Sequence, residues 1–508
     1  MAHRYTAFIV LSITLSLTAQ AQPPVNWERN YGGSELDGFH GMALMPDGGT
    51  VAAGLSNSVS AMVEGNNGGV DFWLMRMDAQ GNMVWNHNFG GSAEDVAHAV
   101  RVGADGNIHV VGHSYSADGF GSQLTELDIV YMRLDPDGVV LHTQRLAGGQ
   151  GSWPCDVLPL PDGGCLIAAT TWIDGAANNA DVHLFRLDAD GDVVWEERFG
   201  GSSYDSAFNM ELRPNGELVV ATTTRSNDGD VTGHMGFGDG WLLRLDLDGH
   251  LIEQRVFGGA YDDQLTRAIS TSDGGMVLTG YISYPMLIWG TMQPATRVWA
   301  TKLSVSGDVQ WEHDFGGTMG DYGWHVLPTP DIGYLLFAYA YSPNGDISEF
   351  HGTIDAWLIK LNANGNMVWD RSFGGWEIDG PSAILPTPDG GLLLAMGVDA
   401  PNAEMSGYLG SVDAWVVKLG GAGVGLDEVL GAAPFIRPDG SGEGYFVDLA
   451  TGDGSTTMEM LDPSGKAILV RSTVQNNMHL QLGDCAPGVY ILRVTSRGQR
   501  YTFKLVRA

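Results

Sequence analysis

The segment DVAHAVRVGADGNIHVVG at residues 95–112 contains two short alternating runs around an Asp-Gly turn at 104–107. After a polar loop, the segment IVYMRLDPDGVVLHTQRL at residues 129–146 repeats this pattern around a second Asp-Gly turn at 135–138. Runs of this kind predict antiparallel strands joined by hairpins. No segment of the chain shows a persuasive helical period. The unit therefore predicts four β-strands.

This unit recurs seven times, and each copy is marked by a Gly-Gly pair, which follows an aromatic residue in six copies. Successive pairs are 58 residues apart, except for one interval of 52 in the third unit. The first glycines of the pairs are Gly32, Gly90, Gly148, Gly200, Gly258, Gly316 and Gly374. Seven repeats of four strands are typical of a β-propeller. The predicted fold is therefore an all-β, seven-bladed propeller.

Aromatic residues recur at two positions of the unit and predict packing between blades, because they bury a large area. The predicted third strands carry Trp73, Tyr131, His183, Trp241, Trp299, Trp357 and Trp415. The predicted fourth strands carry Trp27, Trp85, Trp195, Trp311 and Trp369. Residues 78–85 resemble the tryptophan-docking turns of quinoprotein dehydrogenase propellers, but their Asp-to-Gly spacing is one residue short. A tight hairpin turn is the preferred interpretation.

The two ends of the repeat region complement each other. The seventh unit stops after its third strand, at residues 413–419, while residues 27–31 lie one 58-residue period before residues 85–89. We expect the N-terminal strand to pair into the last blade and close the ring. Closure removes sheet edges that would otherwise favour aggregation.

Residues 355–369 (DAWLIKLNANGNMVW) and the following Phe373-Gly374-Gly375 resemble the bacterial secreted β-propeller repeat family. Residues 181–205 resemble it equally well, and the likeness covers about residues 26–419. The resemblance implies the propeller fold and no common catalytic residues, since function depends on sites grafted onto a fold.

The N-terminus has the features of a signal peptide. His3 and Arg4 precede an apolar stretch at residues 7–17, and Ala19-Gln20-Ala21 is a small-x-small cleavage site. The stretch is too short for a comfortable membrane span, and no other stretch qualifies. Residues 1–21 are therefore predicted to be removed on export, which leaves a propeller over residues 22–419.

The chain is strongly acidic, with a formal net charge of −34. Such a surface repels nucleic acid and anionic membranes and favours solubility. It also suits divalent cations or basic partners, but a solvated acidic coat is the favoured interpretation.

The repeat ends at Leu419, and a Gly-rich linker is predicted over residues 420–431. Residues 432–508 contain short predicted strands with turns at 462–465 and 486–488, which indicate a compact β-sandwich. This region carries eight Lys and Arg against seven Asp and Glu, so it lacks the acidity of the propeller.

Residues 460–466 (MLDPSGK), 488–494 (GVYILRV) and the terminal 504–506 (KLV) resemble the C-terminal sorting domain of the type IX secretion system. The family usually has Asn-Pro near its start, where this chain has Arg437-Pro438. The resemblance implies secretion across the outer membrane of a gram-negative bacterium, with the secretion machinery as a partner. An ordinary accessory sandwich is the alternative.

With antiparallel strands, the loops between second and third strands and the loops between blades open on one face of the disc, the loop-rich face. An aspartate follows the Gly-Gly pair in six units: Asp37, Asp95, Asp205, Asp263, Asp321 and Asp379. The third unit has Trp153 instead. These six rim carboxylates suggest a metal or a cationic ligand. The favoured interpretation is structural, because such an aspartate accepts hydrogen bonds from local backbone N–H groups.

Two of the longer loops resemble short calcium-binding turns, with closely spaced oxygen ligands around a glycine. They lie in units four and six and contain Asp228 with Asp230 and Asn344 with Asp346. Neither loop completes an EF-hand, so Asx turns that stabilise the loops are the alternative. No other cofactor is predicted.

Unit five departs most from the repeat, since its long loop has aromatic residues and no acidic residue between Tyr281 and Arg297. Exposed aromatic side chains on a polar face bind sugars or protein partners. Tyr281, Tyr284, Trp289 and Arg297 are therefore the predicted ligand-binding residues.

Signatures of catalysis are absent from the sequence: there is no Gly-x-Ser-x-Gly, His-Glu-x-x-His, phosphate-binding loop or Cys-x-x-Cys. His40 and His98 fall early on first strands, but the corresponding Asp156, Phe208, Thr266, Trp324 and Ser382 make no ligand set. We predict a non-enzymatic, secreted or cell-surface module that binds polysaccharide or a surface protein. A secreted polysaccharide hydrolase or lyase that uses carboxylates at the channel mouth remains an alternative, as does a purely structural surface component.

Overall fold

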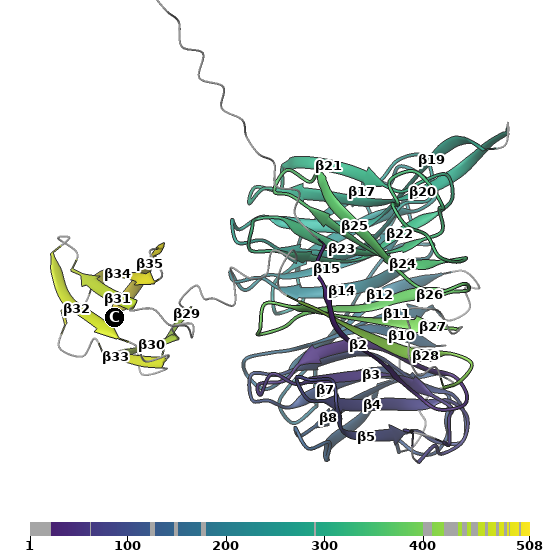
Figure 1. Ribbon diagram of the computed structural model, residues 1–508, viewed down its shortest axis with the longest axis horizontal. Helices are drawn as coiled ribbons and strands as arrows, with labels where there is room; N and C mark the ends of the chain where they lie inside the picture. The colour runs from purple at the N-terminus through teal and green to yellow at the C-terminus, as the bar shows by residue number, and fades with distance from the viewer. Residues whose placement is uncertain are drawn as a thin grey trace, which may run out of the picture.

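The computed structural model in Figure 1 describes most of the chain from residue 22 to residue 507. Residues 1–21, 61, 64, 122–126, 147–150, 174–178, 289–290, 400–408, 421–434, 439–443, 449–455, 463–465, 474–476, 482–484, 487, 497–498 and 508 lie outside the described part. The predicted signal peptide and most of the predicted linker fall among them. The described residues contain 35 strands and no helix.

Seven four-stranded antiparallel sheets form the seven blades, which confirms the predicted propeller. Blade 1 contains β2 (Asp37–Leu44), β3 (Thr50–Ser56), β4 (Asp71–Met77) and β5 (Met83–Phe89), and blade 2 contains β6 (Asp95–Val102), β7 (Ile108–Ser114), β8 (Asp128–Leu134) and β9 (Val140–Leu146). Blade 3 contains β10 (Ser152–Pro159), β11 (Cys165–Trp172), β12 (Ala180–Leu187) and β13 (Val193–Phe199). Blade 4 contains β14 (Asp205–Leu212), β15 (Leu218–Thr224), β16 (Asp239–Leu245) and β17 (Leu251–Phe257).

The remaining three blades complete the ring. Blade 5 contains β18 (Gln264–Ser270), β19 (Met276–Ile288), β20 (Thr291–Leu303) and β21 (Val309–Phe315). Blade 6 contains β22 (Asp321–Pro328), β23 (Tyr334–Ala340), β24 (Asp355–Leu361) and β25 (Met367–Phe373). Blade 7 contains β26 (Asp379–Pro386), β27 (Leu392–Val398), β28 (Asp413–Leu419) and β1 (Val25–Tyr31). The strand β1 pairs antiparallel with β28, so that Trp27 lies opposite Lys418 and Tyr31 opposite Ala414. The N-terminal strand therefore closes the ring, as predicted.

The third-strand aromatic residues fill the space between blades. Trp73, Trp241, Trp357 and Trp415 are among the largest fully buried side chains of the protein. Blade 2 differs from the sequence prediction: Asp128 pairs with Ser114 just as Asp71 pairs with Ser56. The counterpart of Trp73 is therefore Val130, and Tyr131 is one residue out of register because the second unit carries one residue fewer before this strand.

The fourth-strand tryptophans dock onto the next blade, a contact that the sequence interpretation rejected. The indole Nε1 of Trp85, Trp195 and Trp311 donates a hydrogen bond to the carbonyl of Pro136 (3.2 Å), Leu247 (3.1 Å) and Ala363 (3.0 Å), respectively. Each acceptor lies in the hairpin turn of the following blade. The hairpin turn is therefore tight, and its carbonyl group also accepts a hydrogen bond from the indole of the preceding blade.

The glycine of that turn has a positive φ and lies against the docked indole. A Cβ on Gly365, whose φ is 77°, would approach the Trp311 ring to 2.6 Å. A Cβ on Gly81 would approach Trp27 to 2.7 Å, and the Tyr31 hydroxyl donates to the Gly81 carbonyl at 2.5 Å. Because Trp27 and Tyr31 lie on β1, the closing strand binds blade 1 as well as blade 7.

Every first strand contains a β-bulge at the same position. The bulged residues are His40, His98, Cys155, Phe208, Thr266, Trp324 and Ser382. Cys155 replaces the Asp156 expected from the sequence, since the stretch from Gly148 to the bulge is one residue shorter than in the other units. A bulge redirects a side chain and is common beside binding sites.

The C-terminal region contains two antiparallel sheets. One contains β29 (Phe435–Pro438), β30 (Gly444–Asp448) and β33 (Asn477–Gln481), and the other contains β32 (Ala467–Thr473), β31 (Thr456–Leu461), β34 (Gly488–Ser496) and β35 (Gln499–Arg507). Leu480 of the first sheet and Met458, Tyr490 and Leu492 of the second are buried. Two sheets with apolar buried residues are consistent with the predicted β-sandwich.

The substitution Trp195→Ala tests the docking contact between blades 3 and 4. We expect it to lower the free energy of unfolding by about 3 kcal/mol, because it removes a large packed side chain and a hydrogen bond. Val194→Ala on the same strand is the control, since Val194 is exposed and its loss should cost less than about 0.5 kcal/mol. Chemical denaturation of both variants provides the measurement, and equal effects would contradict a role for docking.

Candidate binding site on the loop-rich face

The two types of loop interlock through backbone hydrogen bonds. Asp118, Asp228 and Asn344, from loops between second and third strands, accept hydrogen bonds from the N–H groups of Ser92 (2.8 Å), Ser202 (2.7 Å) and Thr318 (3.1 Å). The donors follow the Gly-Gly pairs between blades. These contacts confirm that both loop types lie on the same face of the propeller.

The residues predicted to bind calcium take part in this interlocking. Asp230 and Asp346 accept hydrogen bonds from the N–H groups of Gly200 (3.1 Å) and Gly316 (3.0 Å), and Asp346 also binds Arg297 at 2.7 Å. The oxygens of these side chains therefore contact protein donors. Calcium binding by these loops stays a prediction, and the contacts favour the alternative that they stabilise the loops.

The six rim aspartates are buried, each at its own junction between two blades. In every case an Oδ2 atom accepts a hydrogen bond from the N–H of the second glycine of the Gly-Gly pair, as Asp95 does from Gly91 at 2.7 Å. The equivalent bonds join Asp37 to Gly33, Asp205 to Gly201, Asp263 to Gly259, Asp321 to Gly317 and Asp379 to Gly375. The geometry supports the structural interpretation and does not gather the six carboxylates into one site.

The predicted ligand-binding residues of unit five do not form a single group. Arg297 binds Asp314 at 2.5 Å, and the Tyr284 hydroxyl donates to the same carboxylate at 2.5 Å. Tyr281 lies apart from this cluster, in a hollow between blades 5 and 6. Trp289 lies outside the described residues.

The hollow has a volume of about 360 Å³, and five aromatic side chains line it. These are Tyr281 on β19, Tyr322 and Trp324 on β22, Tyr339 on β23, and Tyr341 just beyond β23. Tyr322 stands edge-on to Tyr281 at 5.0 Å and to Tyr341 at 5.5 Å between ring centroids. Trp324 stands edge-on to Tyr339 at 5.9 Å. The inner-strand residues Gln264, Thr266 and Gly323 complete the lining.

The hollow has no charged side chain among the residues that line it. Burial raises the pKa of Tyr339 to about 12 and also raises the pKa of Tyr281 and Tyr341. These hydroxyls therefore stay protonated at neutral pH and donate or accept hydrogen bonds. The nearest carboxylate in hydrogen-bond contact is Asp262, which accepts from the Tyr281 hydroxyl at 3.2 Å. The site is suited to a neutral ligand that offers both apolar faces and hydroxyl groups.

The sequence prediction found Tyr281 and missed the four aromatic residues of unit six. A signal was present: Tyr322-Gly323-Trp324 and Tyr339-Ala340-Tyr341 place aromatic residues where the other units have few. Recognising it requires knowing that the second strand of blade 5 faces the first strand of blade 6.

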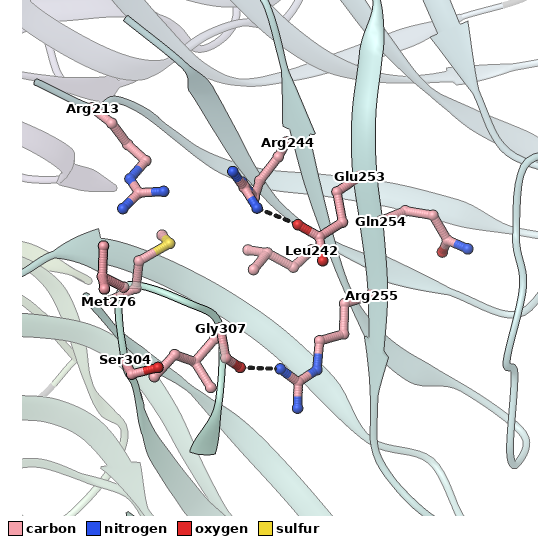
Figure 2. Close-up of a pocket in the computed structure, with 11 residues that line it drawn as sticks. Arg213, Leu242, Arg244, Glu253, Gln254, Arg255, Met276, Ser304 and Gly307 are labelled. Atoms are coloured by element: carbon pink, nitrogen blue, oxygen red, sulfur yellow. Dashed lines mark hydrogen bonds and ion pairs between the residues drawn. The ribbon is translucent and has the colours of Figure 1, made fainter. Parts of the chain in front are cut away.

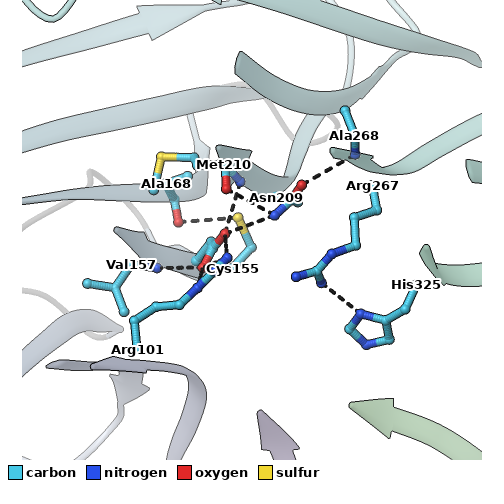
Figure 3. A network of polar contacts seen from close by, with 10 residues as sticks. Arg101, Cys155, Val157, Ala168, Asn209, Met210, Arg267, Ala268 and His325 are labelled. Atoms are coloured by element: carbon cyan, nitrogen blue, oxygen red, sulfur yellow. Dashed lines mark hydrogen bonds and ion pairs between the residues drawn. The ribbon is translucent and has the colours of Figure 1, made fainter. Parts of the chain in front are cut away.

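A polar network deeper in the channel joins neighbouring first strands (Figure 3). Asp156 forms an ion pair with Arg101 at 2.9 Å and accepts hydrogen bonds from the Asn209 amide (3.2 Å) and the Met210 N–H (2.9 Å). Arg267 donates to His325 at 2.7 Å, and Figure 3 shows this pair facing the first group. Burial, followed by the nearby charge of Arg101, lowers the pKa of Arg267 to about 10.

The carboxylates of this channel are already occupied. Asp156 has four protein donors, which include the Val157 N–H at 2.9 Å, and Glu211 accepts from the Ser270 N–H at 2.7 Å. The network therefore links blades 2 to 6 and does not present a free pair of acids of the kind that glycoside hydrolysis requires.

Histidines group around the channel near Trp153. His98 and His113 share a hydrogen bond of 2.7 Å, and His40 stacks on His98 at 5.5 Å between ring centroids. Burial lowers the pKa of His98 well below its ordinary value, and His40 and His113 lower it further. Both imidazoles of the His98–His113 pair have a lowered pKa, so the pair is neutral at pH 7.

A second cavity, between blades 4 and 5, is too small for a ligand (Figure 2). Its volume is about 30 Å³, which is far below the usual volume of a ligand pocket. Arg244 pairs with Glu253 beside it, and Arg255 donates to the Gly307 carbonyl of the next blade. The Arg255 contact joins the two blades, whereas Arg244 and Glu253 both belong to blade 4.

Comparison with known proteins identifies no family model that matches this chain. The regulatory protein FlaEY of Caulobacter vibrioides is 26 % identical over 227 residues, which is 40 % of this chain and 23 % of FlaEY. The chain thus spans less than a quarter of that relative.

Among solved structures, puromycin hydrolase has a TM-score of 0.46 at 13 % identity, covering 83 % of this chain and 60 % of its own. The α-L-arabinofuranosidase Arb93A of Fusarium graminearum has a TM-score of 0.39 at 10 % identity, covering 63 % of this chain and 91 % of its own. PorZ, an essential surface component of the type IX secretion system of Porphyromonas gingivalis, has a TM-score of 0.22 at 10 % identity, covering 92 % and 81 %. These values are too low to assign an activity to this chain.

None of the described residues belongs to a helix that is long and apolar enough to cross a membrane.

The substitution Asp156→Asn tests whether the channel network is structural. Removing the carboxylate charge leaves Arg101 without its ion pair, and we expect a loss of about 3 kcal/mol in the free energy of unfolding. Asp137→Asn, on an exposed hairpin turn, is the control and should change stability by less than about 0.5 kcal/mol. Equal stability of the two variants in denaturation would show that the network does not stabilise the ring.

Proposed function

We propose that this chain is an exported β-propeller that binds a neutral polysaccharide in the hollow between blades 5 and 6. The observation that carries the proposal is the group of five aromatic side chains around one uncharged space of about 360 Å³. This volume lies within the usual range of small-ligand sites. Aromatic rings pack on the apolar faces of sugar rings, while the neutral tyrosine hydroxyls exchange hydrogen bonds with sugar hydroxyls.

The overall charge narrows the class of polysaccharide. A chain with a formal net charge of −34 repels polyanions, so neutral or basic glycans are favoured over acidic ones. A surface protein is the second candidate, because the same aromatic group on the loop-rich face is also suited to a protein partner.

A hydrolase or lyase remains the alternative function. Cleavage of a glycosidic bond by general acid–base chemistry needs two suitably placed carboxylates. The residues that line the hollow include no aspartate or glutamate, and Asp156 and Glu211 of the channel are bound to protein donors. Binding without cleavage is therefore the function that the geometry favours.

We further propose the route to the cell surface. Residues 1–21 would direct export, residues 22–419 would form the exported propeller, and residues 420–431 would link it to a sorting domain at residues 432–508. The support for this organisation is the signal-peptide pattern and the resemblance of the C-terminal region to type IX sorting domains. The chain would then be secreted or held on the outer surface of a gram-negative bacterium.

Depletion of the purified protein from solution by insoluble glycans tests the binding proposal. We expect depletion by at least one of cellulose, chitin, xylan and starch, without release of reducing ends. Trp324→Ala should weaken binding about tenfold or more, since a buried aromatic contact contributes more than about 1.4 kcal/mol. Ile332→Ala, an exposed apolar residue on a turn of the opposite face, should leave binding unchanged.

The outcomes of this experiment separate the functions. Release of sugar by the wild-type protein would identify a hydrolase or lyase. Absence of both depletion and product would reject the polysaccharide proposal and favour a protein partner or a structural role. The melting temperature of each variant must match that of the wild type for the comparison to hold.

Fusion of residues 420–508 to a periplasmic reporter tests the sorting proposal. In a host with an active type IX system, we expect the reporter on the cell surface or in the medium. In the same host without that system, the reporter should stay in the periplasm. A reporter retained in both hosts would show that the region is an accessory sandwich.

A further inference from the structure

At five of the seven blade junctions a second aspartate faces the rim aspartate, and at four of these both side chains are almost completely buried. It comes from the start of the third strand of the preceding blade, and the first glycine of the Gly-Gly pair lies between the two carboxylates. The four pairs are Asp413 with Asp37, Asp71 with Asp95, Asp239 with Asp263, and Asp355 with Asp379. All eight side chains are between 0 and 2 % exposed. The sequence analysis singled out only the second member of each pair.

The two carboxylates of a pair point into the same small space. A Cβ built on Gly90 would lie 2.1 Å from Oδ1 of Asp71 and 2.7 Å from Oδ2 of Asp95. At Gly32 the corresponding distances are 2.8 Å to Oδ1 of Asp413 and 2.9 Å to Oδ2 of Asp37. Only glycine leaves room for this approach, which explains why the first glycine of the pair recurs.

Each pair has at least one buried oxygen atom without a donor, although the Oδ1 atoms of Asp37 and Asp263 accept hydrogen bonds from Ser56 and Ser283. One oxygen of each carboxylate accepts a backbone N–H, as Asp71 does from Asn67 at 2.5 Å. Within the described part of the chain, the buried Oδ1 atoms of both Asp71 and Asp95 have no hydrogen-bond partner. The same is true of Oδ1 in Asp239, Asp355, Asp379 and Asp413. In the four third-strand aspartates, the unpartnered oxygen is the one that points at the glycine.

The junctions that lack one aspartate contain an arginine. Between blades 2 and 3 the rim aspartate is missing, and Arg145 forms a buried ion pair with Asp128 at 2.9 Å. Between blades 5 and 6 Arg297 takes the place of the third-strand aspartate and donates to the Gly316 carbonyl at 2.9 Å.

Between blades 3 and 4, an arginine accompanies a pair that is less buried. Burial and Asp205 raise the pKa of Asp181 to about 6, and the positive charge of Arg198 opposes this rise. A positive charge therefore accompanies the carboxylates at all three exceptional junctions.

Two like charges buried side by side are costly unless a cation or a proton neutralises them. We propose that the four aspartate pairs without an arginine bind a hard divalent cation, Ca²⁺ foremost, which joins each blade to the next. Carboxylate oxygens are the preferred ligands of this ion. Serine hydroxyls that contact the rim aspartates, such as Ser58 at Asp37 and Ser116 at Asp95, offer further oxygen atoms close by.

Histidines stand beside two of the pairs. His234 lies 3.5 Å from Asp239, and His351 lies 3.2 Å from Asp355. Each of these histidines contacts only one aspartate of its pair in these two ion pairs.

A proton shared within each pair is the competing explanation, and it predicts a different pH dependence. Burial, aided by Asp95, raises the pKa of Asp71 to about 6, and burial and Asp355 raise that of Asp379 to about 7. Without a metal, the folded protein thus binds more protons than the unfolded chain between about pH 4 and pH 7. Its stability should fall as the pH rises through this window, and a bound cation should cancel this fall.

Calcium binding by the full chain, stripped with a chelator, tests the proposal. Two quantities are measured. Bound Ca²⁺ is determined by equilibrium dialysis at pH 7.5 against up to about 5 mM Ca²⁺, which is about fivefold above the weakest affinities of extracellular sites. The melting temperature is compared in Ca²⁺ and in EGTA. We expect four bound Ca²⁺ per chain and a rise in melting temperature of about 5 °C or more. Asp71→Asn should bind one Ca²⁺ fewer. Asp321→Asn, at the junction that contains Arg297, is the matched control and should still bind four.

Two results would overturn the proposal. In the first, the protein retains no Ca²⁺, and Ca²⁺ does not change its melting temperature. If that melting temperature also falls from pH 4.5 to pH 7.5, a shared proton neutralises each pair. The other is the same stoichiometry in Asp71→Asn as in the wild type. Asp413→Asn serves as a second variant at another junction, so that a failure of Asp71→Asn to fold does not leave the test undecided.

Discussion

The antiparallel pairing of β1 with β28 is the interaction on which this structure depends. A single four-stranded blade cannot bury both of its faces, and each blade of the ring does so only by packing on its two neighbours. The pairing of residues 25–31 with residues 414–419 joins the two ends of this array. The same strand places Trp27 and Tyr31 on the Gly81 turn of blade 1. Closure thus completes one blade and attaches it to the next.

Three further kinds of contact join neighbouring blades. On the outer strands, indoles such as Trp195 dock on the turns of the following blade. Around the channel, Asp156 and its donors join first strands. On the loop-rich face, the rim aspartates hold the Gly-Gly loops. The docking and rim contacts recur at equivalent positions in most blades, whereas the Asp156 network belongs to one part of the ring. The acidic composition follows in part from the rim carboxylates.

The candidate site lies where the repeat is broken. Blades 5 and 6 place Tyr281, Tyr322 and Trp324 around one hollow, and Trp324 is the bulged residue of its strand. The same region substitutes Arg297 for a buried aspartate. The departures at this junction bring together the aromatic side chains that line the hollow, on which the proposed binding site rests.

The amino-acid sequence alone was sufficient to predict the seven blades, the order of their strands and the ring closure. These features follow from a 58-residue period and from alternating runs, which are local properties of the chain. The period also located Tyr281, but counting from glycine to glycine misplaced Tyr131 and Asp156, where a unit differs by one residue.

Tertiary structure alone decided which residues of different blades meet. Trp311 and Gly365 lie 54 positions apart, and Asp71 and Asp95 belong to separate sheets, so no local pattern records their contact. The aromatic hollow likewise combines Tyr281 of one unit with Tyr322 and Trp324 of the next. The physical reason is that periodicity determines the path of the backbone within a blade, whereas contacts between blades depend on the bulges, the register and the side-chain packing of the closed ring.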